Sequence, residues 1–343
     1  MASPDKEVAG EVPHVIRVYK DGSVERLLSW PSVPPSPNPD PQTGVSSKDI
    51  TISENPKISA RLYLPKIEPD DQKLPILVYF HGGAFCIGSA FSSVDNRYMS
   101  GLVSEARAIA VSIEYRMAPE HPLPAAYEDC WAALNWVASH SESQNEPNKD
   151  PWLLSYGDFE RVYIGGDSAG SNIAHNIAIR AGSENLECNV KILGALILHS
   201  YFWGSNPIGS KTDPDKIKPY LVFDSKSIES ESGVDTDKTL PALVWSFVYP
   251  SAPGGIDNPM INPEGPGAPS LAKLGCSKLL VCVAEHDELR DRGVRYYDLV
   301  KESGWDGELE LYEVEGEGHC FQIFDTETTK AKNMIKHLAA FIK

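Results

Sequence analysis

The sequence predicts an α/β fold in which helices cover both faces of a central, mostly parallel sheet. Residues 76–80 form an uninterrupted apolar run, which is typical of a strand buried on both faces. Residues 108–115 indicate another buried strand, and the β-branched run at 161–164 leads through a glycine-flanked turn into a helix. The 343 residues suffice for one large α/β domain with insertions or for two smaller ones, and we expect one domain over 1–343.

The amino-terminal part is expected to combine a hairpin with an extended arm. Residues 1 to about 13 are expected to be mobile, and the segments 14–19 and 24–27 flank a hairpin turn at Asp21-Gly22. Six prolines between 31 and 41 exclude regular structure there, because proline fixes its backbone and lacks an N–H donor. Strands are expected at about 48–52 and 58–64.

The rest of the chain alternates helices with further strands. Helices are expected at about 125–140 and at 171–180, and an insertion at about 200–250 contains another expected helix, with Trp245, Phe247 and Tyr249. The penultimate strand is expected at 278–284, a helix from 290, the last strand at 309–314 and a closing amphipathic helix at about 326–343.

Composition and charge favour a small-molecule substrate over a polyanion. The chain is 41% apolar and 23% charged, which is typical of a soluble globular protein. Its formal charge of −17 argues against nucleic acid and anionic membranes as partners, because long-range repulsion opposes both. The sequence says nothing about the oligomeric state.

The sequence predicts a cytoplasmic protein without disulfides. Residues 1–7 lack the apolar core of a signal peptide, and no later run approaches membrane-spanning length. The cysteines are scattered without paired spacing, which is typical of free thiols in a reducing compartment. They are Cys86, Cys130, Cys188, Cys276, Cys282 and Cys320. No metal is expected, since the adjacent side chains of Glu285-His286-Asp287 point in different directions at a strand end.

A candidate nucleophile lies in the turn between the run at 161–164 and the following helix. The pattern Gly166-x-Ser168-x-Gly170 between a strand and a helix is that of a nucleophile elbow. Glycines are needed there because side chains two residues from the serine would collide with the neighbouring strand and helix. The turn exposes the Ser168 hydroxyl at the amino end of a helix, whose dipole favours nearby negative charge.

A candidate oxyanion hole follows the apolar run at 76–80. His81-Gly82-Gly83 places two consecutive glycines at the carboxyl end of a strand, where their N–H groups can converge on an anion. We expect the N–H groups of Gly82 and Gly83 to act together with that of Ala169, the residue after the nucleophile.

Three motifs in combination carry a family resemblance. The glycine loop, residues 115–121 (YRMAPEH) and residues 166–170 (GDSAG) resemble the hormone-sensitive-lipase-like group of α/β-hydrolases, and within it the plant carboxylesterases. The resemblance covers nearly the whole chain. It implies the α/β-hydrolase fold, with Ser168 as nucleophile and Gly82 and Gly83 in the oxyanion hole. The chain departs from the family at Ala84, where a third glycine is common, and we expect the methyl group to alter substrate fit.

The acid and the base are expected on loops after the last two strands. Asp287 stands where this family places its acid, with Glu285 and Glu288 as nearby competitors; Glu288 is expected to point outward. His319 follows the last strand on a glycine loop, in the order nucleophile, acid, histidine that this fold uses. We therefore expect a triad of Ser168, Asp287 and His319.

The function that these residues predict is hydrolysis of small carboxylic esters through an acyl-enzyme, without a cofactor. The amino-terminal arm (about 1–45) and the insertion (about 200–250) are expected to form a cap, as the resemblance implies. Non-hydrolytic relatives keep a second function open. These are hydroxyisoflavanone dehydratases and indole-alkaloid cyclases, the latter similar at residues 258–263 (NPMINP) and 331–334 (AKNM). A gibberellin-receptor-like binding protein is disfavoured, because such a receptor does not need His319.

Overall fold

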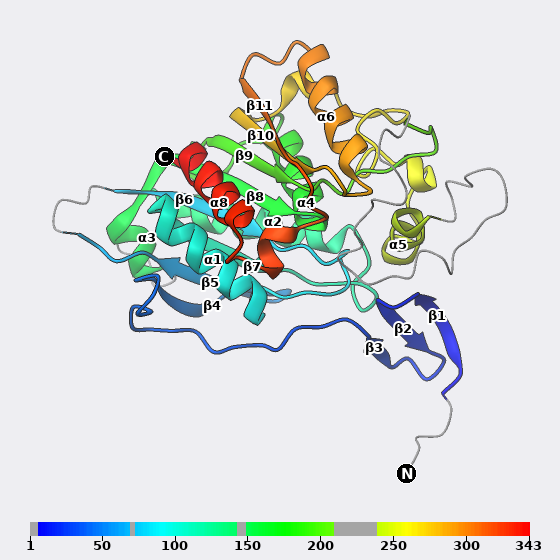
Figure 1. Cartoon of the computed structure of the whole chain (residues 1–343), viewed down its shortest axis with the longest axis horizontal. Helices are drawn as coiled ribbons and strands as arrows, with labels where there is room; N and C mark the ends of the chain where they lie inside the picture. The colour runs from blue at the N-terminus through cyan, green and yellow to red at the C-terminus, as the bar shows by residue number, and fades with distance from the viewer. Residues whose placement is uncertain (1–5, 69–72, 143–148, 209–238) are drawn as a thin grey trace.

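The computed structural model describes residues 6–68, 73–142, 149–208 and 239–343 (Figure 1). In chain order the strands are β1 (Val8–Val12), β2 (Ile16–Tyr19), β3 (Val24–Arg26), β4 (Ser46–Glu54), β5 (Lys57–Leu64), β6 (Leu74–Phe80), β7 (Ile109–Glu114), β8 (Gly157–Asp167), β9 (Ile192–Leu198), β10 (Cys276–Ala284) and β11 (Glu308–Val314). The α-helices are α1 (Ser93–Ala106), α2 (Ala125–Ser139), α3 (Pro151–Tyr156), α4 (Ala169–Ala181), α5 (Leu240–Val248), α6 (Arg290–Glu302), α7 (Phe321–Phe324) and α8 (Thr329–Ile342).

The central sheet has eight strands in the order β11-β10-β9-β8-β6-β7-β5-β4. All neighbours from β11 to β7 pair in parallel, whereas β5 is antiparallel to both β7 and β4. The predicted mostly parallel sheet is therefore confirmed. The carboxyl ends of the parallel strands meet at one edge, where the loops after β6, β8, β9, β10 and β11 lie close together.

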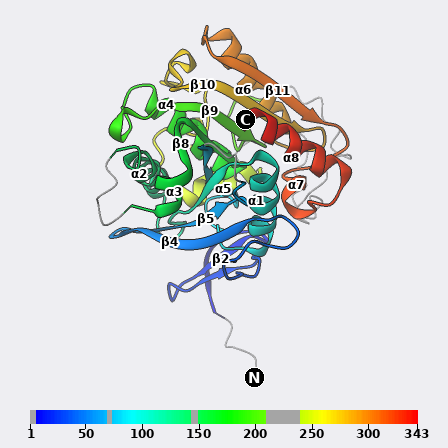
Figure 2. The same cartoon turned by 90° about the vertical axis from the view of Figure 1, so that its left-hand side faces the viewer.

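Helices cover both faces of this sheet, as the sequence predicts (Figure 2). Alternate side chains of β6 show the two layers: Ile76, Val78 and Phe80 belong to the core shared with α2, α4 and α6. Leu77 and Tyr79 point the other way, into the core shared with α1 and α8. Within the described ranges, no helix combines the length and apolar character needed to cross a bilayer.

A small antiparallel sheet, β1-β2-β3, precedes the central one. The predicted hairpin is confirmed as β2 and β3, and its turn places Gly22 at a φ of +83°. The expectation of mobility up to residue 13 is wrong for residues 8–12, which pair with β2 as a third strand. Burial explains the difference, since the Val12 side chain is inaccessible to solvent.

The proline-rich segment 31–41 contains no helix or extended strand, as predicted. It runs along the molecule between β3 and β4 (Figure 1), held by an isolated bridge between Ser32 and Ser92 and by a hydrogen bond from Val33 N–H to Phe91 O. The arm thus crosses from the small sheet to the edge of the large one.

The remaining predicted elements are present, with shifted ends. The strands expected at 48–52 and 58–64 extend as β4 and β5, and the last helix begins at Thr329, because the Thr328 hydroxyl accepts the Ala331 N–H and caps it. In the insertion, α5 confirms the expected helix, while residues 209–238 lie outside the described part. Sequence reasoning did not anticipate α1, α3, β9 or α7.

Candidate active site

The turn between β8 and α4 holds Ser168 in a backbone conformation that few residues adopt, with φ 51° and ψ −116°. The flanking glycines make this possible. A Cβ on Gly170 would lie 1.9 Å from the carbonyl oxygen of Phe80, and one on Gly166 would lie 2.5 Å from the same oxygen. The Ser168 N–H donates to Leu198 O over 2.9 Å, which ties the turn to the end of β9. The sharp turn therefore has a steric requirement for both glycines.

The three residues predicted as a triad lie in hydrogen-bond contact. His319 Nε2 lies 2.9 Å from Ser168 Oγ, and His319 Nδ1 lies 2.8 Å from Asp287 Oδ2. The other carboxylate oxygen of Asp287 accepts the N–H of Leu289 over 2.9 Å. The arrangement has the connectivity of a nucleophile, a base and an orienting acid.

The electrostatics of this chain favour an ionised acid and a basic imidazole. Burial alone would raise the pKa of Asp287, but the charge of His319 and hydrogen bonds from His199 and His319 outweigh it and hold the pKa below its usual range. Burial would likewise lower the pKa of His319, but the Asp287 carboxylate outweighs it and raises that pKa. The Asp287 carboxylate therefore stabilises the imidazolium that forms when His319 accepts a proton.

The structure separates Asp287 from its two acidic competitors. Glu285 accepts the N–H of Gly316 over 2.7 Å and so faces the β11 loop. Glu288 is exposed, as expected. Partial desolvation and the charge of Asp287 raise the pKa of its carboxyl group to about 7. Of these three acidic residues, only Asp287 hydrogen-bonds to His319.

The glycine loop lies beside the elbow, but its first glycine is engaged. Gly82 N–H donates to Asp167 Oδ1 over 3.2 Å, and a Cβ on Gly82 would lie 2.1 Å from Asp167 Oδ2. Gly83 has a φ of +104°, and Ala84 follows at +54°, in the left-handed region. Within the described part of the chain, the N–H groups of Gly83 and Ala84 have no acceptor. The Ala169 N–H opens α4, where no intrahelical acceptor exists.

A second histidine, which sequence reasoning missed, contacts the acid. His199 Nδ1 lies 3.3 Å from Asp287 Oδ2, and its Nε2 lies 3.0 Å from Gln322 Oε1. The signal that could have found it is the apolar run at 192–198, which forms β9. His199 directly follows this strand, at the same edge of the sheet as Ser168 and Asp287.

The same cluster contains the groups of the described chain that could ligate a metal. One ligand atom each from His199, Asp287 and His319 lies within 4.8 Å of the others. The Nδ1 atoms of His319 and His199 lie 2.8 and 3.3 Å from the same oxygen, Asp287 Oδ2, which are hydrogen-bond distances. Together with the contact from His319 to Ser168, these hydrogen bonds join the three groups and the serine in one network.

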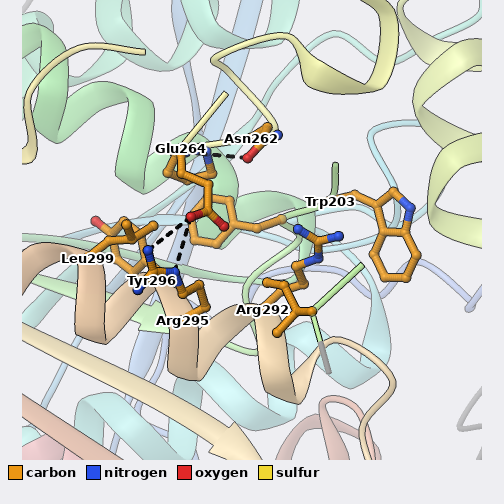
Figure 3. A pocket seen from close by; sticks show the side chains of 10 residues that line it. Trp203, Asn262, Glu264, Arg292, Arg295, Tyr296 and Leu299 are labelled. Atoms are coloured by element: carbon orange, nitrogen blue, oxygen red, sulfur yellow. Dashed lines mark hydrogen bonds and ion pairs between the residues drawn. The ribbon is translucent and has the colours of Figure 1, made fainter. Parts of the chain in front are cut away.

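Aromatic side chains of the insertion pack around the glycine loop. Tyr201 and Trp245 contact the Phe85 ring edge-on, with ring centroids 5.8 and 6.4 Å away. Both side chains are buried, so packing between the insertion and the core accounts for them. Figure 3 shows a separate pocket beside α6, where Arg295 pairs with Glu264 and Arg292 lies near Trp203. None of the triad residues lines that pocket.

Comparison with known proteins identifies the family of the chain. A family model described as the alpha/beta hydrolase fold matches residues 77–323. The chain belongs to the α/β-hydrolase fold family. The predicted resemblance to plant carboxylesterases of this fold and to alkaloid cyclases is confirmed by relatives of both kinds.

Two curated relatives and one solved structure show how wide the family's chemistry is. The chain is 56% identical to 2-hydroxyisoflavanone dehydratase of Glycyrrhiza echinata, over 98% of this chain and 97% of the relative. It is 47% identical to tabersonine synthase of Catharanthus roseus, with both chains covered completely. A hyperthermophilic esterase from the archaeon Pyrobaculum calidifontis has a similar structure, with a TM-score of 0.64, 28% identity, and 87% and 82% of the two chains covered. This α/β-hydrolase thus has relatives with hydrolytic and with non-hydrolytic names.

Proposed function

We propose that this α/β-hydrolase is a carboxylesterase that hydrolyses small carboxylic esters through an acyl-enzyme on Ser168. The observation that carries the proposal is the continuous contact from Ser168 Oγ to His319 and on to Asp287, at 2.9 and 2.8 Å. A hydroxyl becomes a competent nucleophile only when a positioned base takes its proton, and this contact supplies one.

In the first half-reaction, His319 Nε2 takes the proton of Ser168 as Oγ attacks the ester carbonyl. Asp287 keeps the hydrogen of the neutral imidazole on Nδ1 and stabilises the charged ring. The imidazolium then gives its proton to the leaving alcohol, and an acyl-enzyme remains. In the second half, His319 takes a proton from water, whose oxygen attacks the acyl carbon, and the imidazolium returns that proton to Ser168 Oγ as the acid leaves. No step requires a cofactor.

The proposed oxyanion hole consists of the N–H groups of Gly83, Ala84 and Ala169. Gly83 and Ala169 are the donors expected from the sequence. Ala84 takes the place expected for Gly82, because the Gly82 N–H already donates to Asp167. Donors that have no other acceptor are pre-organised for the alkoxide, since no existing bond must break first.

The proposed architecture is one α/β-hydrolase domain over 1–343, with a cap from residues 1–45 and 200–250. Its support is the packing of β1 against α5, which joins segments more than 200 residues apart (Figure 1). The six free cysteines favour a reducing, cytoplasmic compartment. The charge of −17 favours a small ester or alkaloid-like substrate over nucleic acid or an anionic membrane.

Dehydration is the second candidate function, favoured by relatives named 2-hydroxyisoflavanone dehydratase at 56% and 52% identity. Elimination of water needs a base for the C–H proton and an acid for the leaving hydroxyl. His319 would take the proton, the C–H electron pair would form the new double bond, and Glu288 would protonate the departing hydroxyl as water. The pKa of Glu288, raised to about 7, suits an acid that is protonated near neutral pH. Ring closure, the alkaloid-cyclase alternative that the sequence leaves open, would use the same groups, and a relative named tabersonine synthase is 47% identical.

One pair of assays separates the two candidates. Hydrolysis of p-nitrophenyl acetate requires the nucleophile, so Ser168→Ala should abolish it, and mass spectrometry should detect an acyl group on Ser168 in the wild type. Turnover of a 2-hydroxyisoflavanone should survive Ser168→Ala, because elimination needs no nucleophile. Wild-type protein that is inert toward every ester tested, yet dehydrates the hydroxyisoflavanone, would overturn the esterase proposal.

A further inference from the structure

His199 contacts the catalytic acid from a second direction. The residue directly follows β9, its side chain is buried, and its backbone has a φ of +49°. Its N–H donates to Cys282 O over 2.8 Å, which fixes the backbone against β10. A left-handed conformation costs a non-glycine residue free energy, and such strain persists where the surroundings impose it. The structure therefore holds this imidazole at Asp287 by backbone as well as by side-chain contacts.

The hydrogen on the His199 ring can be assigned from its two partners. Asp287 is ionised, since its pKa is held below the usual range, and an ionised carboxylate only accepts hydrogen bonds. Nδ1, which lies 3.3 Å from Asp287 Oδ2, must therefore carry a hydrogen. A ring whose only hydrogen is on Nδ1 offers a lone pair on Nε2, which needs a donor.

Gln322 can supply that donor. The Gln322 Oε1 atom lies 3.0 Å from His199 Nε2. The amide nitrogen of Gln322 is buried and has no hydrogen-bond partner among the described residues. A half-turn of the amide group presents the nitrogen to the ring instead, and the orphaned donor is then satisfied. Since a buried unpaired N–H is costly, this orientation is favoured, and it fixes the hydrogen of His199 on Nδ1.

We infer that His199 is a positioning residue of this active site: oriented by Gln322, it donates to Asp287 Oδ2 and holds that carboxylate in line with His319. Asp287 Oδ2 then accepts two imidazole N–H groups, and Oδ1 accepts Leu289 N–H. A buried carboxylate with three donors cannot rotate without breaking one of them. The hydrogen-bonded chain therefore continues past the triad, from Asp287 through His199 to Gln322.

The second imidazole also limits how strongly the acid holds the proton of His319. Each hydrogen bond to the carboxylate disperses its negative charge, so removal of His199 should strengthen the pull on His319 and raise its pKa. Other ionisable groups around the two rings are Asp167, Glu288 and the buried thiols of Cys282 and Cys320. Burial raises the pKa of both thiols, so they stay neutral in the range where His319 titrates.

Two substitutions at one position test the inference. His199→Leu removes the donor to Asp287, whereas the side-chain nitrogen of His199→Asn can occupy the place of Nδ1 and keep it. His175→Leu is the matched control: this buried imidazole contacts Tyr296 over 3.0 Å and has no bond to the triad. Gln322→Met removes the partner of His199 Nε2 alone.

The measurement is the rate of inactivation by diethyl p-nitrophenyl phosphate across pH, together with proton spectra of the imidazole N–H groups. His199→Leu should react about ten- to a hundredfold more slowly, which is the range for loss of one hydrogen bond to a charged group. The acidic limb of its pH–rate profile, where the rate falls as His319 becomes protonated, should lie at higher pH. His199→Asn should recover most of the rate and the wild-type limb. Gln322→Met should lower the inactivation rate and raise the pH of the acidic limb by smaller amounts, and His175→Leu should change neither quantity. Wild-type spectra should contain two strongly downfield N–H signals, and His199→Leu only one.

The inference fails if His199→Leu reacts at the wild-type rate with an unshifted limb, or if His199→Asn is as impaired as His199→Leu. It fails equally if the wild type has a single downfield N–H signal. The kinetic arm depends on the proposed acyl transfer, whereas the spectra do not. Wild-type protein that never reacts with the phosphate ester would therefore count against the esterase proposal, and the spectra alone would then decide the role of His199.

Discussion

The carboxylate of Asp167 accepts the N–H of Gly82 over 3.2 Å, so the residue before the nucleophile holds the glycine loop that faces it. The Tyr79 hydroxyl donates to the same oxygen over 2.9 Å. One buried carboxylate thus connects β6, the glycine loop and the elbow, and it fixes the distance between the nucleophile and the proposed oxyanion donors.

Asp167→Ala should lower kcat for p-nitrophenyl acetate about ten- to a hundredfold with little change in KM, because the loop loses its bond to a charged acceptor. Asp167→Asn keeps an oxygen that can accept from Gly82 and Tyr79, and should stay within tenfold of the wild type. Steady-state kinetics of the two variants provide the check. Equal losses of kcat in both variants would mean that the charge of Asp167 matters and its hydrogen bond to Gly82 does not.

Ala84→Gly should stabilise the protein and change its acyl preference. Ala84 sits at a φ of +54°, a region that costs an L-residue about 1 kcal/mol and glycine nearly nothing. Thermal unfolding should show a gain of at most about 1 kcal/mol, whereas Ala90→Gly, at a buried alanine without positive φ, should show a loss. Removal of the methyl group should also favour larger acyl groups. An equal change in kcat for every acyl size would contradict the steric part of this prediction.

The pH dependence of kcat/KM should reflect the raised pKa of His319. The base works only when neutral, so activity should fall as pH drops through that pKa, and the limb should lie above the usual imidazole range. Asp287→Asn removes the charge that outweighs burial, so the limb should move to lower pH. Its kcat should fall by up to about ten-thousandfold, as in other triads that lose the acid. A limb that stays in place in Asp287→Asn would show that another group titrates.

Glu288→Gln should affect the two candidate reactions differently. Dehydration would lose its acid and fall at least about a hundredfold. Ester hydrolysis should keep its mechanism, but its acidic limb should move to lower pH, since the charge of Glu288 contributes to the raised pKa of His319. Parallel assays on p-nitrophenyl acetate and a 2-hydroxyisoflavanone measure both effects. A dehydration rate within a few-fold of the wild type would remove Glu288 as the acid.

The features that the sequence predicted are those encoded by neighbouring residues. Ser168 is recognisable because its glycines, the preceding strand and the following helix adjoin it along the chain. The run that became β6 is apolar throughout, and β7 is buried at all positions but its last, because helices cover both of their faces. By contrast, α1 was not anticipated: it contains Gly101 and many polar residues, and its helix is stabilised by packing against α8.

Contacts between loops could not be predicted in the same way. The engagement of Gly82 by Asp167 depends on the direction of one side chain, which no spacing encodes. His199 was missed because β9 was missed, and a lone histidine after an unrecognised strand carries no signal. The third strand of the small sheet was missed because its pairing with β2 and the burial of Val12 are tertiary features.

The packing of β1 against α5 has a practical consequence. Residues 8–12 pack against a helix that begins only at Leu240, so in the proposed cap strand β1 would influence which molecules reach the serine. Trimming the start of the protein, or fusing a purification handle to it, should therefore alter selectivity while leaving the reacting groups intact. Specificity in such a protein can diverge through changes far from any residue that touches the reaction.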